Sequence, residues 1–212
     1  FNLLNIGKWH AACQLDGLFA EICGEGLVEI RVTHAIPERS WEILHCEIVR
    51  LAAGTPYLAD LSHYPAGAAR GLIYIEITAL EKPVAITGGR FLTRTRPDSL
   101  PRLAVSITTF RREAQVRDTV ARLERFLGGF EFAAQMHVQL VDNGASVGLE
   151  PSPATTPIVN RNLGGAGGFA RGLIEAEKAG FSHCLFMDDD ASFHLENIAR
   201  TYALLALARD RR

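Results

Sequence analysis

The first half of the chain alternates apolar and polar residues with a period of about two, which is typical of half-buried β-strands. Proline and glycine separate these segments, and no amphipathic helix is predicted among them. Many short strands at this spacing predict an antiparallel β-sandwich over residues 1–96. The segments with this alternation are Leu27–Thr33, Trp41–Arg50, Gly71–Leu80, Val84–Thr87 and Arg90–Thr95.

The pattern changes after the polar, proline-containing segment Thr93–Pro101, which we interpret as a linker. Short, continuous apolar runs then alternate with helical patterns. Such an order predicts a parallel sheet with helices on its faces, and residues 102–212 are therefore expected to form a Rossmann-like α/β domain. The predicted strands are Leu103–Thr108, Val138–Val141, Pro157–Val159 and Cys184–Met187.

Three helices are predicted in this second half. The first buries a stripe formed by Val116, Val120, Leu123 and Leu127. The second covers Gly167–Ala179, with Phe169, Leu173 and Ile174 facing inward and Gly180 ending it. The third covers Leu195–Arg209.

Composition narrows the classes of function. The chain has 212 residues, 48% of them hydrophobic, and a formal net charge of −2, which is typical of a globular protein. Its basic residues are scattered, so nucleic acid is not expected as a partner. No apolar stretch approaches the roughly 20 residues that span a bilayer. The four cysteines lack C-x-x-C spacing, and we interpret them as reduced thiols of a cytoplasmic protein.

Polar residues follow each of the four predicted parallel strands. The carboxyl ends of such strands meet at one edge of the sheet, where ligands bind. Four polar ends on one edge therefore predict a ligand site. The four groups are Thr108–Arg111, Asp142 with Asn143, Asn160–Asn162, and Asp188–Asp190.

The three adjacent aspartates predict a cation site. Their mutual repulsion after a buried strand costs stability unless a cation compensates it. In an extended segment, Asp188 and Asp190 point the same way and could share one ion, while Asp189 faces elsewhere. Oxygen ligands suit Mn²⁺ or Mg²⁺. The alternative is a solvated acidic turn that precedes the next helix.

The glycine-rich segment Asn162–Gly172 predicts a close approach of backbone to a phosphate, at the start of a helix. Arg171, expected one turn into that helix, could reach the phosphate. A flexible loop is the alternative. Gly165, Gly167 and Ala170 also match a dinucleotide fingerprint, but two strands precede them and three acids follow where that fingerprint needs one.

Four motifs of the second half resemble those of the family 2 glycosyltransferases of the GT-A fold. In order along the chain they are VSITTFRR, QLVDN, NRNLGGAGGFARG and CLFMDDDA. More narrowly, they are similar to the polymerising galactofuranosyltransferases of mycobacterial galactan synthesis, in which a β-sandwich precedes the GT-A domain. The specific motifs cover residues 102–212, and only architecture supports the likeness of residues 1–96. The resemblance implies inverting, metal-dependent transfer from UDP-galactofuranose or a related UDP-sugar to a glycan or lipid-linked glycan.

The same resemblance implies roles for individual residues. Thr109 and Arg111 would lie beside the uracil and diphosphate, and Asp142 would accept a hydrogen bond from uracil. Asn162 and Arg171 would flank the nucleotide, Gly164 and Gly165 would shape its pocket, and Asp188 and Asp189 would contact the donor. Asp188 and Asp190 would bind Mn²⁺ or Mg²⁺.

The resemblance implies an acceptor site and a catalytic base in a second half of the family's domain, and we expect these 212 residues to lack that half. We therefore expect the chain to bind the nucleotide without transferring sugar, and we assign no catalytic residue. A lipid-linked acceptor would place the parent enzyme at the inner face of the cell membrane, and the sheet edges leave room for a homo-oligomer. The alternative is a non-catalytic glycan-binding protein with a degenerate nucleotide-binding domain. Its sugar-stacking aromatics would be Trp9, Trp41, Tyr57, Tyr64 and Tyr74.

Overall fold

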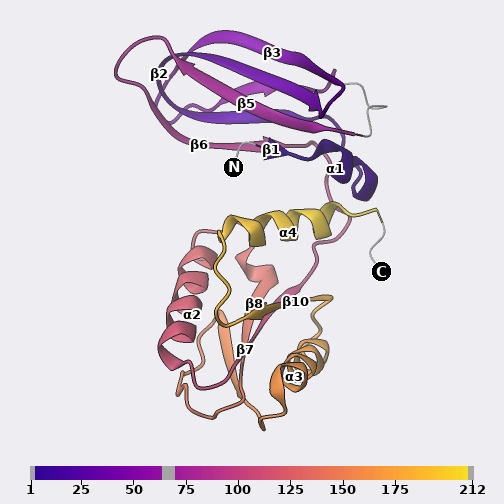
Figure 1. Ribbon diagram of the computed structural model, residues 1–212, viewed down its shortest axis with the longest axis vertical. Coiled ribbons are helices and arrows are strands. Elements are labelled where there is room, and N and C mark those ends of the chain that lie inside the picture. The colour runs from indigo at the N-terminus through magenta and orange to yellow at the C-terminus, as the bar shows by residue number, and fades with distance from the viewer. Residues whose placement is uncertain (1–2, 64–69, 210–212) are drawn as a thin grey trace. The chain divides into compact units, whose positions relative to one another are not determined.

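A computed structural model describes residues 3–63 and 70–209. They form two compact units, each with its own hydrophobic core. The first holds the chain up to Pro97 together with the segment from Leu207, and the second spans Asp98–Ala206. The first is built on antiparallel strands, and the second on a separate four-stranded parallel sheet with helices, so the expected mixture of α and β structure is confirmed (Figure 1). Tyr64 lies outside the described residues.

One long strand, β2 (Phe19–Ile36), organises the first unit because it pairs with four others. Its first part pairs with β4 (Tyr57–Asp60) and β6 (Ala85–Leu92), and its second part with β3 (Ser40–Leu51) and β5 (Leu72–Ala79). The short β1 (Leu3–Leu4) joins the free side of β5. Even-numbered residues of both parts of β2 are buried in one shared core: Ala20, Ile22, Val28, Ile30 and Val32.

The strand changes partners at its glycines. Pairing with β6 shifts register between Cys23 and Gly24, and pairing with β3 begins at Gly26. Gly26 has a φ of +108°, which only glycine adopts readily. A side chain at Gly24 would lie 2.4 Å from the carbonyl oxygen of Ala85, so the neighbouring strand also requires glycine there.

Several details of the first unit differ from the sequence prediction. A helix is present, α1 (Ile6–Ala12), which Asn5 caps by accepting a 3.0 Å hydrogen bond from the backbone N–H of Lys8. Seven residues are too few for a helical period to stand out. The segments expected at Val84–Thr87 and Arg90–Thr95 form one strand, β6, because Gly88 and Gly89 pair in the ladder rather than forming a turn. β4 was not predicted.

The second unit contains the predicted parallel sheet, in the order β10-β7-β8-β9. Its strands are β7 (Leu103–Thr109), β8 (Met136–Asp142), β9 (Thr155–Val159) and β10 (His183–Asp188). Its α-helices are α2 (Glu113–Leu127), α3 (Gly164–Lys178) and α4 (Glu196–Leu207), and a 3-10 turn covers Ala133–Gln135. None of the helices in the described residues is both long and apolar enough to cross a membrane.

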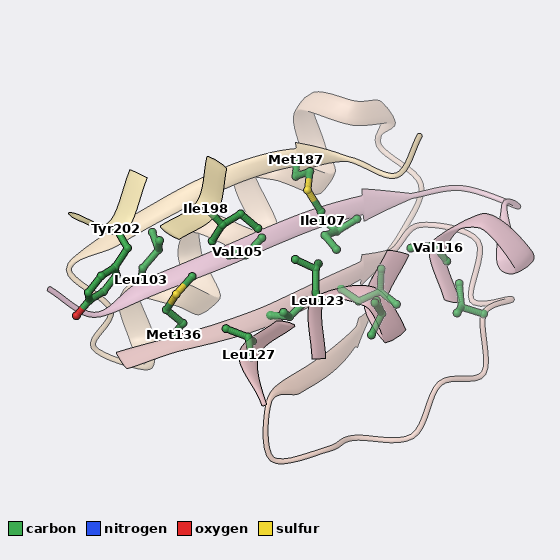
Figure 2. Packing of buried hydrophobic residues seen from close by; sticks show 14 of the residues in the cluster. Leu103, Val105, Ile107, Val116, Leu123, Leu127, Met136, Met187, Ile198 and Tyr202 are labelled. Carbon is green, nitrogen blue, oxygen red and sulfur yellow. The ribbon is translucent and has the colours of Figure 1, made fainter. Parts of the chain in front are cut away.

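The two faces of the sheet carry different side chains. Odd-numbered residues of β7 point into an apolar core formed with α2 and α4, where Leu103, Leu123 and Tyr202 are among the fully buried side chains (Figure 2). The predicted stripe of Val116, Val120, Leu123 and Leu127 is confirmed. On the other face, the buried residues of β7 are Ala104 and the polar Ser106 and Thr108.

Helix α3 packs on this polar face through glycine, which corrects the predicted orientation. Leu173 and Ile174, expected to face inward, are 49% and 46% exposed, and Phe169 is partly buried against Phe186 of β10. The buried positions of α3 are instead Gly168, Gly172 and Ala176. The apolar side chains of Leu173 and Ile174 suggested the wrong buried face, because the space between α3 and β7 admits only small residues.

The contact between α3 and β7 leaves no space for a side chain. A Cβ atom at Gly172 would lie 1.9 Å from the Oγ of Ser106, and one at Gly168 would lie 2.2 Å from the Cγ2 of Thr108. These distances are far below van der Waals contact. The backbone of the helix therefore rests directly on the strand.

Gly172→Ala is expected to destabilise the second unit by about 1–3 kcal/mol, the usual cost of overpacking. Gly165→Ala is the matched control in the same helix, because a Cβ there meets nothing within 4 Å, and it should be neutral or stabilising. Urea unfolding followed by helical circular dichroism measures the difference. Equal stability of the two variants would contradict the packing described here.

Candidate functional site

The carboxyl ends of the four parallel strands are joined by hydrogen bonds into one rim. At the centre, the backbone N–H of Asn143, after β8, donates to the carbonyl oxygen of Thr109 at the end of β7 (3.0 Å). The backbone N–H of Asn160, after β9, donates to the carbonyl oxygen of Asp142 (2.9 Å). On the other side, the Thr109 hydroxyl donates to Asp189 Oδ2, after β10 (2.7 Å). The polar ends that the sequence placed on one edge are thus in mutual contact.

Asp189 is the aspartate most firmly held at this rim. Its side chain is 11% exposed, whereas that of Asp190 is 60% exposed. The alternation expected along an extended segment does not apply, because β10 ends at Asp188 and a turn begins at the next residue. Asp189 therefore points to Thr109 instead of away from the site.

Arg112 is a site residue that the sequence analysis did not assign. Its Nη1 lies 2.6 Å from Asp190 Oδ2 and 3.5 Å from Asp189 Oδ1. This guanidinium holds the pKa of Asp190 below its usual range, first through the hydrogen bond and then through its charge. The sequence signal that could have identified Arg112 as a site residue is its position directly after Arg111, in the loop that follows the first strand of the sheet.

Asp142 has a structural task at the rim. Its carboxylate is 4% exposed and accepts hydrogen bonds from the backbone N–H groups of Gly144, Ser146 and Val147 at 2.8–2.9 Å. These bonds fold the loop after β8. A carboxylate can accept about four hydrogen bonds, so one acceptor position remains for the uracil contact that the resemblance implies.

Asn143 and Asn160 tie the rim to the start of α3. The side-chain amide of Asn160 donates to Asn143 Oδ1 (2.8 Å), and that of Asn143 donates to the carbonyl oxygen of Gly164 (3.2 Å). Asn162 Oδ1 accepts a hydrogen bond from the backbone N–H of Gly164 (3.1 Å). The sequence placed Asn143 and Asn160 among the polar strand ends of the predicted site but gave neither residue a role of its own.

The start of α3 is open. A Cβ at Gly164 or Gly165 would meet nothing within 4 Å. The N-cap residue, Leu163, makes no side-chain capping hydrogen bond, and Asn162 satisfies the N–H of Gly164. Backbone N–H groups in the first turn of a helix have no intrahelical partner and favour anions. The helix begins at Gly164, three residues before the predicted start, so the glycines form its first turns.

This earlier start moves Arg171 away from the rim. It lies seven residues after Gly164, about 10 Å along the helix, and donates to Glu175 Oε1 (3.0 Å). Arg111 has a positive φ of 54°, and its guanidinium lies 5.1 Å from the centre of the Phe110 ring. The structure therefore gathers Thr109, Asp142, Asp189 and the helix start, but not Arg171.

The aspartates alone do not complete a metal site. Among residues 3–63 and 70–209, no three His, Cys, Asp or Glu side chains are grouped to hold a metal ion. The Asp188 carboxylate is exposed, and Asp190 is paired with Arg112. Carboxylate oxygens are nevertheless suitable ligands for Mn²⁺ or Mg²⁺, which commonly take their remaining ligands from phosphate and water.

A depression of about 390 Å³ lies elsewhere, where the strands of this sheet begin. Arg102, His137 and Phe181 are in its lining. The Arg102 guanidinium stacks 4.7 Å from the centre of the Phe181 ring, and burial lowers the pKa of His137. Its lining includes a single acid, Glu124, in place of the three adjacent acids of the rim, so the rim remains the candidate site.

Comparison with known proteins adds no family assignment. No protein-family model matches the chain, and no curated protein matches it. The geometry of the rim is therefore the basis for any statement about function.

Asp142→Ala is expected to destabilise the second unit by about 3 kcal/mol, because it removes the acceptor of three backbone donors beneath the rim. Asp188→Ala is the matched control, since it removes an exposed carboxylate of the same rim and should change stability little. Urea unfolding compares the two variants. A stable Asp142→Ala protein would show that the loop does not depend on this carboxylate.

Arg112→Gln is expected to raise the pKa of Asp190 toward its ordinary value, because a carboxylate loses charge stabilisation when a neighbouring cation is removed. Carboxyl-carbon NMR titration of the two proteins measures the shift. An unchanged pKa would mean that the ion pair does not form in solution.

Proposed function

We propose that the second unit is the donor-binding part of a metal-dependent glycosyltransferase that uses a nucleoside-diphosphate sugar. The observation that carries this proposal is the rim. Three adjacent acids, an open glycine-rich helix N-terminus and the polar ends of the neighbouring strands meet at one edge of a parallel sheet.

Each part of the rim suits one part of such a donor. The backbone N–H of Gly165, in the first turn of α3, has no intrahelical partner and favours a phosphate. Asp188 and Asp190 would hold a divalent cation, which neutralises charge on the departing diphosphate when bound. Because the protein offers the cation few ligands, oxygens of the diphosphate would complete the coordination sphere of the cation.

The alternative at this edge, a dinucleotide site, has less support. A dinucleotide ribose needs one acid after the second strand of its motif, whereas the end of β10 and the turn after it present three. The glycine-rich helix α3 also follows β9 and not the first strand of the sheet. Both features agree better with a sugar nucleotide and a cation.

The finer structural assignments belong to the same proposal. We infer that the parallel sheet is the donor half of a GT-A domain. The antiparallel unit, in which the two parts of β2 share one core, is assigned as a β-sandwich. The motifs quoted above favour a UDP-sugar such as UDP-galactofuranose, a glycan or lipid-linked glycan acceptor, and a parent enzyme that works at the cytoplasmic face of the membrane.

Calorimetric titration with UDP, with and without Mn²⁺, tests the donor site. Binding is expected to require Mn²⁺ and to fall by at least about tenfold in Asp188→Ala/Asp190→Ala, since metal ligands are removed. The matched control is Asp118→Ala/Glu177→Ala, which removes two exposed acids from α2 and α3 and should bind as the original chain does.

The outcomes separate the alternatives. Equal binding by both double variants would exclude a metal site at the aspartates. Binding of NAD in preference to UDP would favour the dinucleotide alternative. Binding of a glycan without any effect of Mn²⁺ or UDP would favour a non-catalytic glycan-binding protein, in which Trp41, with 71% of its surface exposed, is the foremost sugar contact.

A further inference from the structure

We propose that Arg112 is an internal counter-ion that makes cation binding at Asp190 conditional on the donor diphosphate. The inference rests on the proposed function, because it concerns regulation of that same site. It adds a role for Arg112 and an order of events that the resemblance does not imply.

The guanidinium occupies the charge position that a cation would need. It lies 2.6 Å from Asp190 Oδ2 and 3.5 Å from Asp189 Oδ1, so one positive group already bridges two of the three acids. Arg112 is also the N-cap residue of α2, but its side chain makes no capping hydrogen bond. The side chain is therefore free to serve the aspartates.

A divalent cation alone would meet an unfavourable site. It could take the exposed Asp188 carboxylate directly, but Asp190 is engaged by Arg112, and two cations close together repel each other. To gain Asp190 as a ligand, the metal ion must displace the guanidinium. Metal binding in the absence of a nucleotide should accordingly be weak.

The diphosphate changes this balance because it gives Arg112 another anion to bind. A guanidinium binds phosphate oxygens at least as well as it binds carboxylate oxygens, often through two hydrogen bonds. Transfer of Arg112 from Asp190 to the diphosphate leaves two carboxylates open to the metal ion, which also gains phosphate ligands. By linkage, the nucleotide must then tighten metal binding by the same factor as the metal ion tightens nucleotide binding.

The exposure of the pair is consistent with such release. The Arg112 side chain is 48% exposed and that of Asp190 is 60% exposed. Water screens an ion pair at this depth, so an incoming ligand can separate it. Asp189, at 11% exposure and held by Thr109, stays in place while Arg112 moves.

The test is the affinity for Mn²⁺, measured as free ion by electron paramagnetic resonance, with and without UDP. Arg112→Gln should bind Mn²⁺ alone on the order of fivefold more tightly than the original chain, the range expected for an exposed ion pair. The enhancement of Mn²⁺ affinity by UDP should fall by a similar factor. Arg125→Gln, which removes an exposed arginine from the far end of α2, controls for net charge and should leave the metal-only affinity unchanged.

The outcomes distinguish this inference from the function on which it rests. If Arg112→Gln binds Mn²⁺ alone no more tightly than the original chain, while UDP and Mn²⁺ still bind together, the counter-ion role is overturned and the donor site stands. If neither protein binds Mn²⁺ or UDP, both are overturned. Helical circular dichroism confirms that the variant is folded.

Discussion

The close packing of α3 on β7 is the constraint on which the candidate site depends. The helix can lie against the strand only because Gly168 and Gly172 face Thr108 and Ser106, where a Cβ atom would overlap them. This contact places the start of α3 within reach of Asn143, which donates to the carbonyl oxygen of Gly164. A helix held farther away by larger side chains would lose that bond. The open N–H groups would then no longer belong to the same edge as the aspartates.

The rim also has an unusual balance of charge. Three acids follow a strand end, yet only one basic side chain, Arg112, is paired with them among residues 3–63 and 70–209. Uncharged donors also contribute: the Thr109 hydroxyl donates to Asp189, and backbone N–H groups donate to Asp142, a fourth acid of the rim. Acceptors of this kind are held in fixed positions without being fully neutralised. Such an edge suits ligands that arrive together with a cation.

The sequence predicted those features that depend on local periodicity. The buried run at β7 and the stripe of α2 were visible because apolar spacing directly reports a buried face, and the alternation of strands with helices indicated a parallel sheet. The sequence prediction failed where glycine is required by the close approach of a neighbouring element. The first part of β2 escaped notice because Gly24 and Gly26 interrupt the alternation, although both are required by adjoining strands. Likewise, the buried side of α3 has almost no apolar side chains to show it, and the pairing of Arg112 depends on a turn whose direction no local pattern specifies.

The pairing scheme of the first unit has a consequence for the order in which it can be completed during synthesis. β2 leaves the ribosome early, but its partner β6 is made only after β3, β4 and β5. Cys13 forms its bridge with Ala208 later still, and its carbonyl oxygen accepts a hydrogen bond from Arg209, 196 residues further along the chain. At roughly 5–20 residues per second, that interval lasts on the order of 10–40 s. The whole of the parallel-sheet unit is translated in between. The segment at Cys13 therefore stays without these two C-terminal partners until translation is nearly finished, whereas β2 already has β3, β4, β5 and β6.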